Sequence, residues 1–159
     1  MRTAAGNHII GPVYFPPRLK STDYLDFLQN SLELLLEDLP LALTRSIVFQ
    51  HDGCPVHTSR IVKDFLNQKY GNQWIGRNGP IQWPPRSPDL NPVDYFIWGR
   101  AKELVYTEEI LNIEQLKQKI DNAFETMKAE IQLSVTTTEI RRRVELCISV
   151  EGSHFEHLR

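Results

Sequence analysis

The chain has 159 residues, of which 41% are hydrophobic and 24% charged, and its formal net charge is −2 at pH 7. This is enough for one domain with a hydrophobic core, and the charge excludes a protein that neutralises nucleic acid over its whole surface. Any contact with DNA would have to be local or come from another domain. No run of about 18 apolar residues and no signal-peptide core is present, so we expect neither a membrane partner nor secretion.

The first predicted element is a short strand or hairpin over residues 8–15, which Pro16 and Pro17 end. Ser21-Thr22-Asp23 then opens a helix, because a side-chain oxygen at this point can accept hydrogen bonds from free backbone N–H groups. Apolar residues follow at helical spacing, namely Tyr24, Leu25, Leu28, Leu32 and Leu35. The helix should end before Pro40, since proline disfavours helical geometry in the residue that precedes it.

The next part of the chain alternates between strands and helices. Residues 47–49, an apolar run, are predicted to form a strand that is buried on both faces. The following elements are a helix at 58–69, a turn-rich loop at 75–80, a strand at 81–83, a helix at 92–105 with proline in its first position, and helices at 113–127 and 139–150. This order predicts an α/β core with a helical C-terminal extension, residues 107–159.

Cys54 and Cys147 are the two cysteines of the chain and lie far apart in the sequence. We expect two reduced thiols, as is usual in intracellular proteins. Neither cysteine belongs to a CxxC pair or to a paired His/Cys spacing, so the sequence does not predict a zinc site.

Asp52 follows Phe49-Gln50-His51 and should lie at the carboxyl end of the predicted strand. Ligands bind at this edge in open α/β sheets, so Asp52 is a candidate metal ligand. The alternative is a carboxylate that only stabilises a turn, because Asp before Gly is a common turn sequence. His51 should point to the other side of the strand, since successive side chains alternate.

Asp94 is the second candidate and lies just inside a predicted helix. Asn91 is a suitable N-cap, and Asp94 then occupies the acidic position of a capping box, which is the structural alternative. Helical spacing also places Asp94 on the same face as Ile97, Ala101 and residues 104–105, which should pack on the sheet. A carboxylate there is costly unless it is paired or binds a metal ion, and both roles can hold together.

Two carboxylates of this kind suit phosphodiester cleavage by two metal ions. Such sites hold the ions roughly 3.5–4 Å apart, where one activates the attacking hydroxyl and the other stabilises the leaving oxygen. Mg²⁺ prefers a few carboxylates together with water and substrate oxygens. Asp52 and Asp94 could therefore supply part of a Mg²⁺ or Mn²⁺ site, although two carboxylates are few for two metal ions.

Two sequence blocks around these aspartates carry a specific resemblance. HDGCPVH at 51–57 and WPPRSPDLNPVDYFIWG at 83–99 resemble the second and third acidic blocks of mariner-type DNA transposases of the DDE/D superfamily. The resemblance covers nearly the whole chain, from residues 9–12 to 152–157, and extends to transposable-element-derived proteins of insects. It implies a ribonuclease-H-like α/β fold, with a mixed sheet flanked by helices, and one catalytic domain over residues 1–159.

By this resemblance Asp52 matches the second acid of the catalytic triad and Asp94 the third, with 41 residues between them. The implied activity is metal-dependent cleavage at transposon ends, followed by attack of a 3′-hydroxyl on target DNA. The implied cofactor is Mg²⁺ or Mn²⁺, bound weakly by an incomplete site. The implied partners are transposon ends and target DNA, and the implied location is therefore the nucleus. A homo-oligomer is also compatible with the resemblance.

The chain departs from the family in its first residues. The first triad aspartate of the family lies on the first strand, upstream of the segment matching residues 9–12, but this chain has no acidic residue before Asp23. A counterpart of the helix-turn-helix region that recognises transposon ends is also missing. We therefore expect a truncated C-terminal part of the catalytic domain that lacks the first strand and is inactive alone. The alternative is a co-opted, non-enzymatic DNA- or protein-binding module, or a decaying element.

A local surplus of cations surrounds the candidate site, with seven Lys and Arg against four Asp and Glu between Gly53 and Tyr106. The candidates for DNA contact are His57, Arg60, Lys63 and Arg86. A solvated surface is the alternative for the cations, and a structural hydrogen bond or support of the Asp52 turn is the alternative for His57. The basic triplet at 141–143 is a second candidate patch. Trp74, Trp83 and Trp98 are expected to serve in packing.

Overall fold

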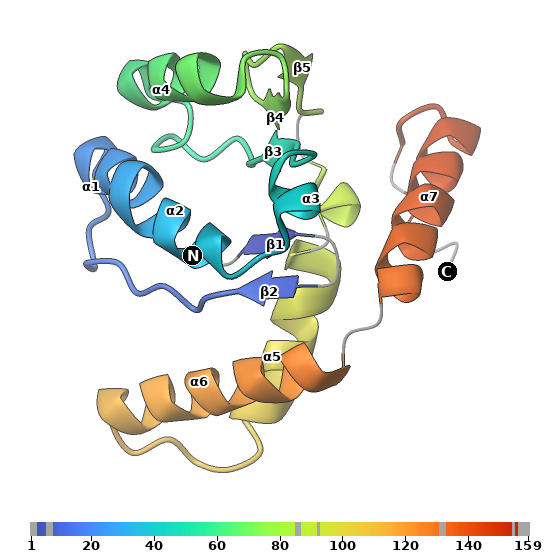
Figure 1. Ribbon diagram of the computed structural model, residues 1–159. Helices are drawn as coiled ribbons and strands as arrows, with labels where there is room; N and C mark the ends of the chain where they lie inside the picture. The colour runs from blue at the N-terminus through green and yellow to red at the C-terminus, as the bar shows by residue number, and fades with distance from the viewer. Residues whose placement is uncertain are drawn as a thin grey trace. The chain divides into compact units, whose positions relative to one another are not determined.

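The computed structural model describes residues 3–5, 8–84, 87–91, 93–130, 133–153 and 155. The chain divides into two compact units. The first contains Val13–Ser87, and the second combines Arg2–Pro12 with Pro88–Arg159. Figure 1 shows the elements of both units, coloured along the chain.

The first unit begins with one continuous helix at the predicted position. It consists of α1 (Ser21–Asp26), the π-helical turn η1 (Phe27–Ser31) and α2 (Leu32–Glu37). The residue before it is Lys20, whose backbone N–H donates to the Asp23 carboxylate at 3.0 Å. The predicted cap was therefore wrong in detail, because Ser21 is already helical and Asp23 reaches back to the start of the helix.

A parallel sheet of three short strands follows in this unit. The strands are β3 (Phe49–Gln50), β4 (Trp74–Gly76) and β5 (Ile81–Gln82), hydrogen-bonded in that order. The strand predicted at 81–83 is confirmed, whereas residues 75–76 belong to a strand in place of the predicted loop. Strand β4 forms because β3 and β5 on its two sides supply hydrogen-bond partners for its backbone. Tertiary context therefore overrides the local turn signal of this segment.

The prediction of a strand buried on both faces at 47–49 is only partly correct. The short helix α3 (Leu41–Thr44) precedes this region. Phe49 is 5% exposed, but Val48 is 49% exposed, and Gln50 is exposed as well. Because side chains alternate along a strand, β3 packs one face into the core and leaves the opposite face open.

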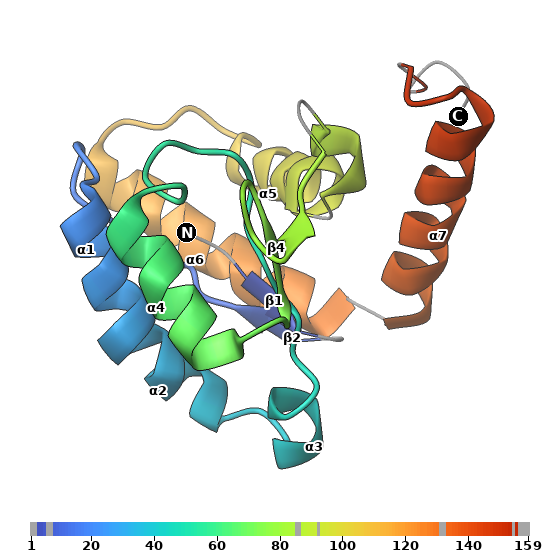
Figure 2. The same cartoon turned by 90° about the horizontal axis from the view of Figure 1, so that it is seen from above.

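Helix α4 (Arg60–Tyr70) packs against α1 and β4, and Figure 2 shows it alongside α1 and α2. It begins two residues after the predicted start and ends at Gly71, whose φ of 56° favours glycine. The Lys69 ammonium pairs with the Glu33 carboxylate on α2. The buried core of the unit consists of Tyr24, Phe27, Leu28, Leu32, Phe49, Val62, Leu66 and Trp74.

The second unit contains a hairpin and the remaining helices. Strand β1 (Thr3–Ala5) pairs antiparallel with β2 (His8–Ile10), which confirms the predicted strand for residues 8–10. The helices are η2 (Pro88–Leu90), the π-helical η3 (Val93–Ile97), α5 (Trp98–Val105), α6 (Ile113–Glu130) and α7 (Leu133–Ser149). Their shared core contains Ile9, Ile97, Ala101, Phe124 and Met127. In the part of the chain that the structure describes, no helix has the length and apolar character needed to cross a membrane.

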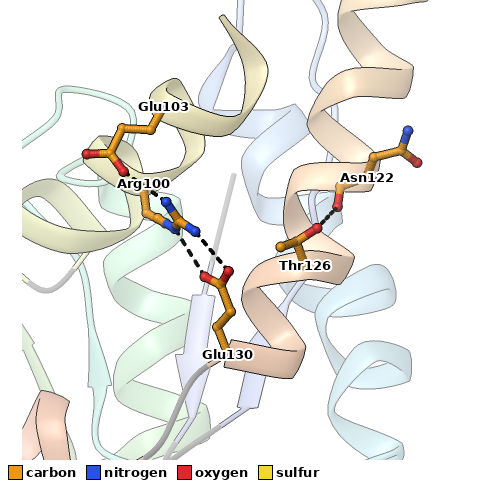
Figure 3. Close-up of polar contacts among 5 residues, drawn as sticks. All are labelled: Arg100, Glu103, Asn122, Thr126 and Glu130. Atoms are coloured by element: carbon orange, nitrogen blue, oxygen red, sulfur yellow. Dashed lines mark hydrogen bonds and ion pairs between the residues drawn. The ribbon is translucent and has the colours of Figure 1, made fainter. Parts of the chain in front are cut away.

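An arginine clamp joins α5 to α6 (Figure 3). The Arg100 guanidinium donates to both oxygens of Glu130, at 2.8 and 3.0 Å, and to Glu103 at 3.1 Å. Hydrogen bonds to the two carboxylates raise the pKa of Arg100 above its ordinary value, and the hydrogen bond from Arg100 lowers the pKa of Glu130. Arg100 was counted among the local cations, but its donors are engaged in holding two helices together.

The packing of the first unit predicts a contrast between two leucines of α2. Leu32 is 1% exposed and Leu34 is 64% exposed. Leu32→Ala should lower the free energy of unfolding by about 2–5 kcal/mol because it leaves a cavity in the core. Leu34→Ala, the matched control, should change it by less than about 0.5 kcal/mol. Urea denaturation followed by circular dichroism measures both, and equal losses would contradict this packing.

Candidate functional site

Asp52 lies two residues beyond the carboxyl end of β3, as the sequence predicted. Its Oδ1 atom accepts the backbone N–H of Cys54 at 3.0 Å and lies 2.7 Å from Nδ1 of His57. Within residues 8–84, both hydrogen bonds to this carboxylate end on Oδ1. The Asp52 side chain is 47% exposed, so its second oxygen, Oδ2, is available to a ligand from solvent.

The same contacts keep the Asp52 carboxylate ionised. Its pKa is lowered below the ordinary value, chiefly by the hydrogen bond from His57 and further by the backbone N–H of Cys54, while partial burial acts in the opposite direction. Hydrogen bonds to a charged carboxylate favour the charged form, which is the form that binds a divalent cation. The donor set therefore fits a hard metal ion at Oδ2.

His57 is positioned by a tight turn before α4. Its backbone N–H donates to the Cys54 carbonyl at 2.9 Å, and the N–H of Thr58 donates to the same oxygen at 3.1 Å. The His57 side chain is 16% exposed, and its ring centre lies 4.6 Å from that of Tyr24. His57 thus bonds the side chain of Asp52, and its predicted contact with DNA stays a prediction.

His51 belongs to this group of residues, although no sequence pattern predicted its inclusion. Its ring stacks on the His57 ring, with centres 5.0 Å apart and an angle of 12° between the planes. The residue is 5% exposed, and its buried Nδ1 atom has no hydrogen-bond partner among the residues that the structure describes. Alternation along the strand predicted only that His51 points away from Asp52, and it could not reveal that His57 folds back onto it.

A glycine makes room for the His51 ring. A Cβ atom added to Gly76 on β4 would lie 2.6 Å from Cδ2 of His51 and 2.8 Å from Cζ3 of Trp74. Both neighbours are buried, and the Trp74 indole is held further by its N–H, which donates to Oδ1 of Asn67 at 3.0 Å. The close approach of β4 to the two rings therefore requires glycine at this position.

Asp94 is the second residue of η3 in the other unit, and its side chain is exposed. The Asn91 side chain caps this helix, since its Oδ1 accepts the N–H of Val93 at 3.2 Å. Its Nδ2 donates to Oδ2 of Asp94 at 2.9 Å. The predicted capping box is thus present in modified form. The backbone N–H of Asn91 donates to the Pro88 carbonyl, so the Asp94 carboxylate accepts its hydrogen bond from the Asn91 side-chain amide.

The prediction that Asp94 shares the packed face of the helix was wrong. Ile97 is 2% exposed and Ala101 3% exposed, whereas Asp94 faces solvent. A π-helical turn closes its hydrogen bonds over five residues, so the angle per residue is smaller than in an α-helix and positions 94 and 97 do not align. Asp94 is therefore accessible at low desolvation cost.

The basic triplet at 141–143 is not a uniform surface patch. Arg143 is 4% exposed, its Nε donates to Oε1 of Glu139 at 2.8 Å, and its guanidinium lies 3.8 Å from the ring centre of Tyr95. Tyr95 follows Asp94 directly, so α7 holds the start of η3 through this cation–π contact. Only Arg141 and Arg142 are exposed.

The predicted DNA contacts differ in availability. The Arg60 side chain is 92% exposed and lies 3.7 Å from Asp64 one turn along α4, while Lys63 is half-buried. Arg86 lies outside the described residues. Trp74 is fully buried and confirmed as a packing residue, whereas Trp98 is 42% exposed and its packing role stays a prediction.

Burial of His51 predicts a pH dependence of stability. Burial, and then the nearby His57, lower the pKa of His51 from 6.5 to about 4. The unfolded chain therefore takes up a proton below pH 6.5, where the folded chain stays neutral, so folding loses free energy as the pH falls from 6.5 toward 4. The loss should reach about 3 kcal/mol. The lowered pKa of Asp52 affects the free energy of folding only when the pH falls below the ordinary pKa of 3.8, which lies outside this window.

Urea denaturation of the wild type and of His51→Leu, each at pH 7 and pH 4.5 with EDTA present, tests this expectation. The variant lacks the titrating group, so its stability should fall less between the two pH values. Curves that shift equally in both proteins would show that His51 does not titrate as its burial requires.

Comparisons with known proteins find relatives of this chain in sequence and in fold. No protein-family model matches the chain. The Tc3 transposase of Caenorhabditis elegans is 30% identical over 139 residues, which are 86% of this chain and 38% of that protein. The chain thus spans about two fifths of the length of this relative.

Two solved structures of the Mos1 transposase catalytic domain resemble the fold. The one with Raltegravir and Mn has a TM-score of 0.72 at 24% identity and covers 95% of this chain and 74% of that chain. The one with Raltegravir and Mg has a TM-score of 0.66 at 25% identity and covers 87% and 66%. The mixed α/β arrangement is therefore the ribonuclease-H-like fold of transposase catalytic domains. In sequence and in fold, this chain is a homologue of the catalytic domain of the Tc1/mariner family of transposases.

Proposed function

We propose that this chain binds DNA and holds Mg²⁺ or Mn²⁺ through Asp52 and Asp94 for cleavage and strand transfer at phosphodiester bonds. The observation that carries the proposal is the carboxylate of Asp52, which is ionised, fixed through Oδ1 and free to offer Oδ2 at the carboxyl edge of the sheet. The solved Mos1 catalytic domains that contain Mn and Mg support the choice of metal.

Each side chain has a defined part in this proposal. His57 keeps Asp52 oriented through its hydrogen bond, and Asn91 does the same for Asp94. Bound Mg²⁺ or Mn²⁺ would supply Lewis-acid activation of a phosphoryl oxygen and of the attacking hydroxyl. Because two carboxylates neutralise only part of the charge of two divalent ions, we expect weak metal binding by this chain and little activity from it alone.

DNA is the proposed partner, and the nucleus the proposed location. Arg60 supports this, because it lies three residues after His57 and its guanidinium is almost fully exposed. Lys63, one turn further along α4, and Arg86 are proposed to contact phosphates with it, and His57 to lie near the substrate. A homo-oligomer remains part of the proposal for the DNA-bound state.

The metal site gives the first test of this function. Wild-type protein should bind Mn²⁺ weakly, and Asp52→Ala should abolish binding because it removes the fixed carboxylate. Asp94→Ala should weaken binding as well. The loss of the free Mn²⁺ signal in electron paramagnetic resonance, measured during a titration with protein, reports the bound fraction directly.

Asp64→Ala is the matched control, since it removes an exposed carboxylate from α4 without touching Asp52. Its titration should coincide with that of the wild type. Coinciding titrations of the wild type and Asp52→Ala would refute the metal site and leave a non-enzymatic DNA- or protein-binding module as the function.

Arg60 gives a test of DNA contact. Arg60→Ala should weaken binding to a duplex regardless of its sequence and lower the slope of log Kd against log salt by about 1, because one phosphate contact is lost. Fluorescence anisotropy of a labelled duplex at several salt concentrations measures the slope. Lys128→Ala, which removes a cation from a comparable helical ion pair with Glu125 on α6, should leave the slope unchanged. If both variants lowered it equally, Arg60 would act only through net charge.

A further inference from the structure

A second kind of metal ligand lies beside Asp52. Asp52, Cys54 and His57 each offer one ligand atom, and these atoms lie within 4.8 Å of one another. Cys54 is a free thiol and half-buried. A thiolate, an imidazole and a carboxylate form a ligand set that suits Zn²⁺, whereas Mg²⁺ binds oxygen ligands and discriminates against sulfur.

We propose that Cys54, His57 and Asp52 form a binding site for a thiophilic divalent cation of the Zn²⁺ class. The ligands would be Sγ of Cys54, one ring nitrogen of His57 and the carboxylate of Asp52. Three protein ligands leave the fourth position of a tetrahedral site to water. Binding releases the thiol proton of Cys54 to solvent, because the thiolate is the form that ligates metal.

The turn that carries these ligands is already formed by the chain. The Cys54 N–H donates to Asp52, and the Cys54 carbonyl accepts two backbone N–H groups from the residues at 57 and 58. The His57 ring contacts the rings of both Tyr24 and His51. Metal binding should therefore cost little conformational entropy. The side chains need only rotate enough to exchange the His57–Asp52 hydrogen bond for bonds to the metal ion.

The sequence did not predict this site, because its spacing is none of the usual cysteine pairs. Three ligands fall within six residues, from Asp52 to His57. Such a short interval normally brings no three side chains together, but the turn at 54–58 folds His57 back onto Asp52. The ligands thus converge through a local turn, and the characteristic spacing by which zinc sites are usually recognised in a sequence is not needed.

The site has a consequence for the proposed function, since both metals require the Asp52 carboxylate. A bound Zn²⁺-class ion would occupy Asp52 and exclude Mn²⁺ or Mg²⁺ from it. The thiophilic site does not depend on the proposed catalysis, because Cys54 has no part in Mn²⁺ binding.

Co²⁺ is a suitable probe for the complete chain, because a cobalt–thiolate bond gives a charge-transfer absorption band in the near ultraviolet. The wild type should develop this band with a stoichiometry of one ion per chain, and added Zn²⁺ should remove it. Cys54→Ser should lose the band, and His57→Ala should bind Co²⁺ more weakly. Cys147→Ser, the matched control with the other thiol removed, should keep it.

A band that survives in Cys54→Ser, or that disappears in Cys147→Ser, would overturn the proposal, and so would the absence of a band in the wild type. Circular dichroism of each variant checks that the fold is retained. Mn²⁺ titration separates the two ideas: Cys54→Ser should bind Mn²⁺ as the wild type does. A cobalt–thiolate band without any Mn²⁺ binding would refute the catalytic metal site alone, and Mn²⁺ binding without the band would refute the thiophilic site alone.

Discussion

The hydrogen bond between His57 and Asp52 is the contact on which the candidate metal centre depends. It closes the turn after β3, keeps the carboxylate ionised, and determines which carboxylate oxygen remains available. The His57 ring in turn contacts buried aromatic rings, one of which belongs to the hydrophobic core of the first unit. The orientation of Asp52 therefore depends on the packing of this core. A half-exposed acid is thereby held in one orientation, and its hydrogen bonds outweigh the effect of partial burial on its pKa.

The second acid is held by a different device. Asp94 lies at the start of a helix, where Asn91 binds both the backbone and the carboxylate. Arg143 reaches from α7 to the neighbouring Tyr95 and thereby fixes the same helical turn. The charges of Arg143 and Arg100 therefore serve packing, whereas Arg60 on α4 keeps an almost fully exposed guanidinium.

The sequence predicted most helices, and it placed Asp52 after a strand and Asp94 at the start of a helix. Both results rest on local signals, namely the periodicity of apolar residues and the prolines at the ends of elements. It misplaced the cap of the first helix and missed strand β4, since Asp23 acts backward along the chain and β4 exists only through pairing with its neighbours. The π-helical turn at Asp94 altered which residues share a face. The stacking of His51 on His57 and the approach of Cys54 to Asp52 and His57 depend on a tight turn, whose geometry no residue spacing could reveal.

The absence of a side chain at Gly76 makes this centre vulnerable to a change that touches none of its ligands. Any larger residue there would push into the His51 ring, and His51 supports the histidine that orients Asp52. In a genomic copy that is no longer under selection, one missense change in this glycine codon would disturb the candidate centre while every acidic residue survived. An intact set of acids in a related copy is therefore insufficient evidence of competence, and position 76 should be inspected together with them.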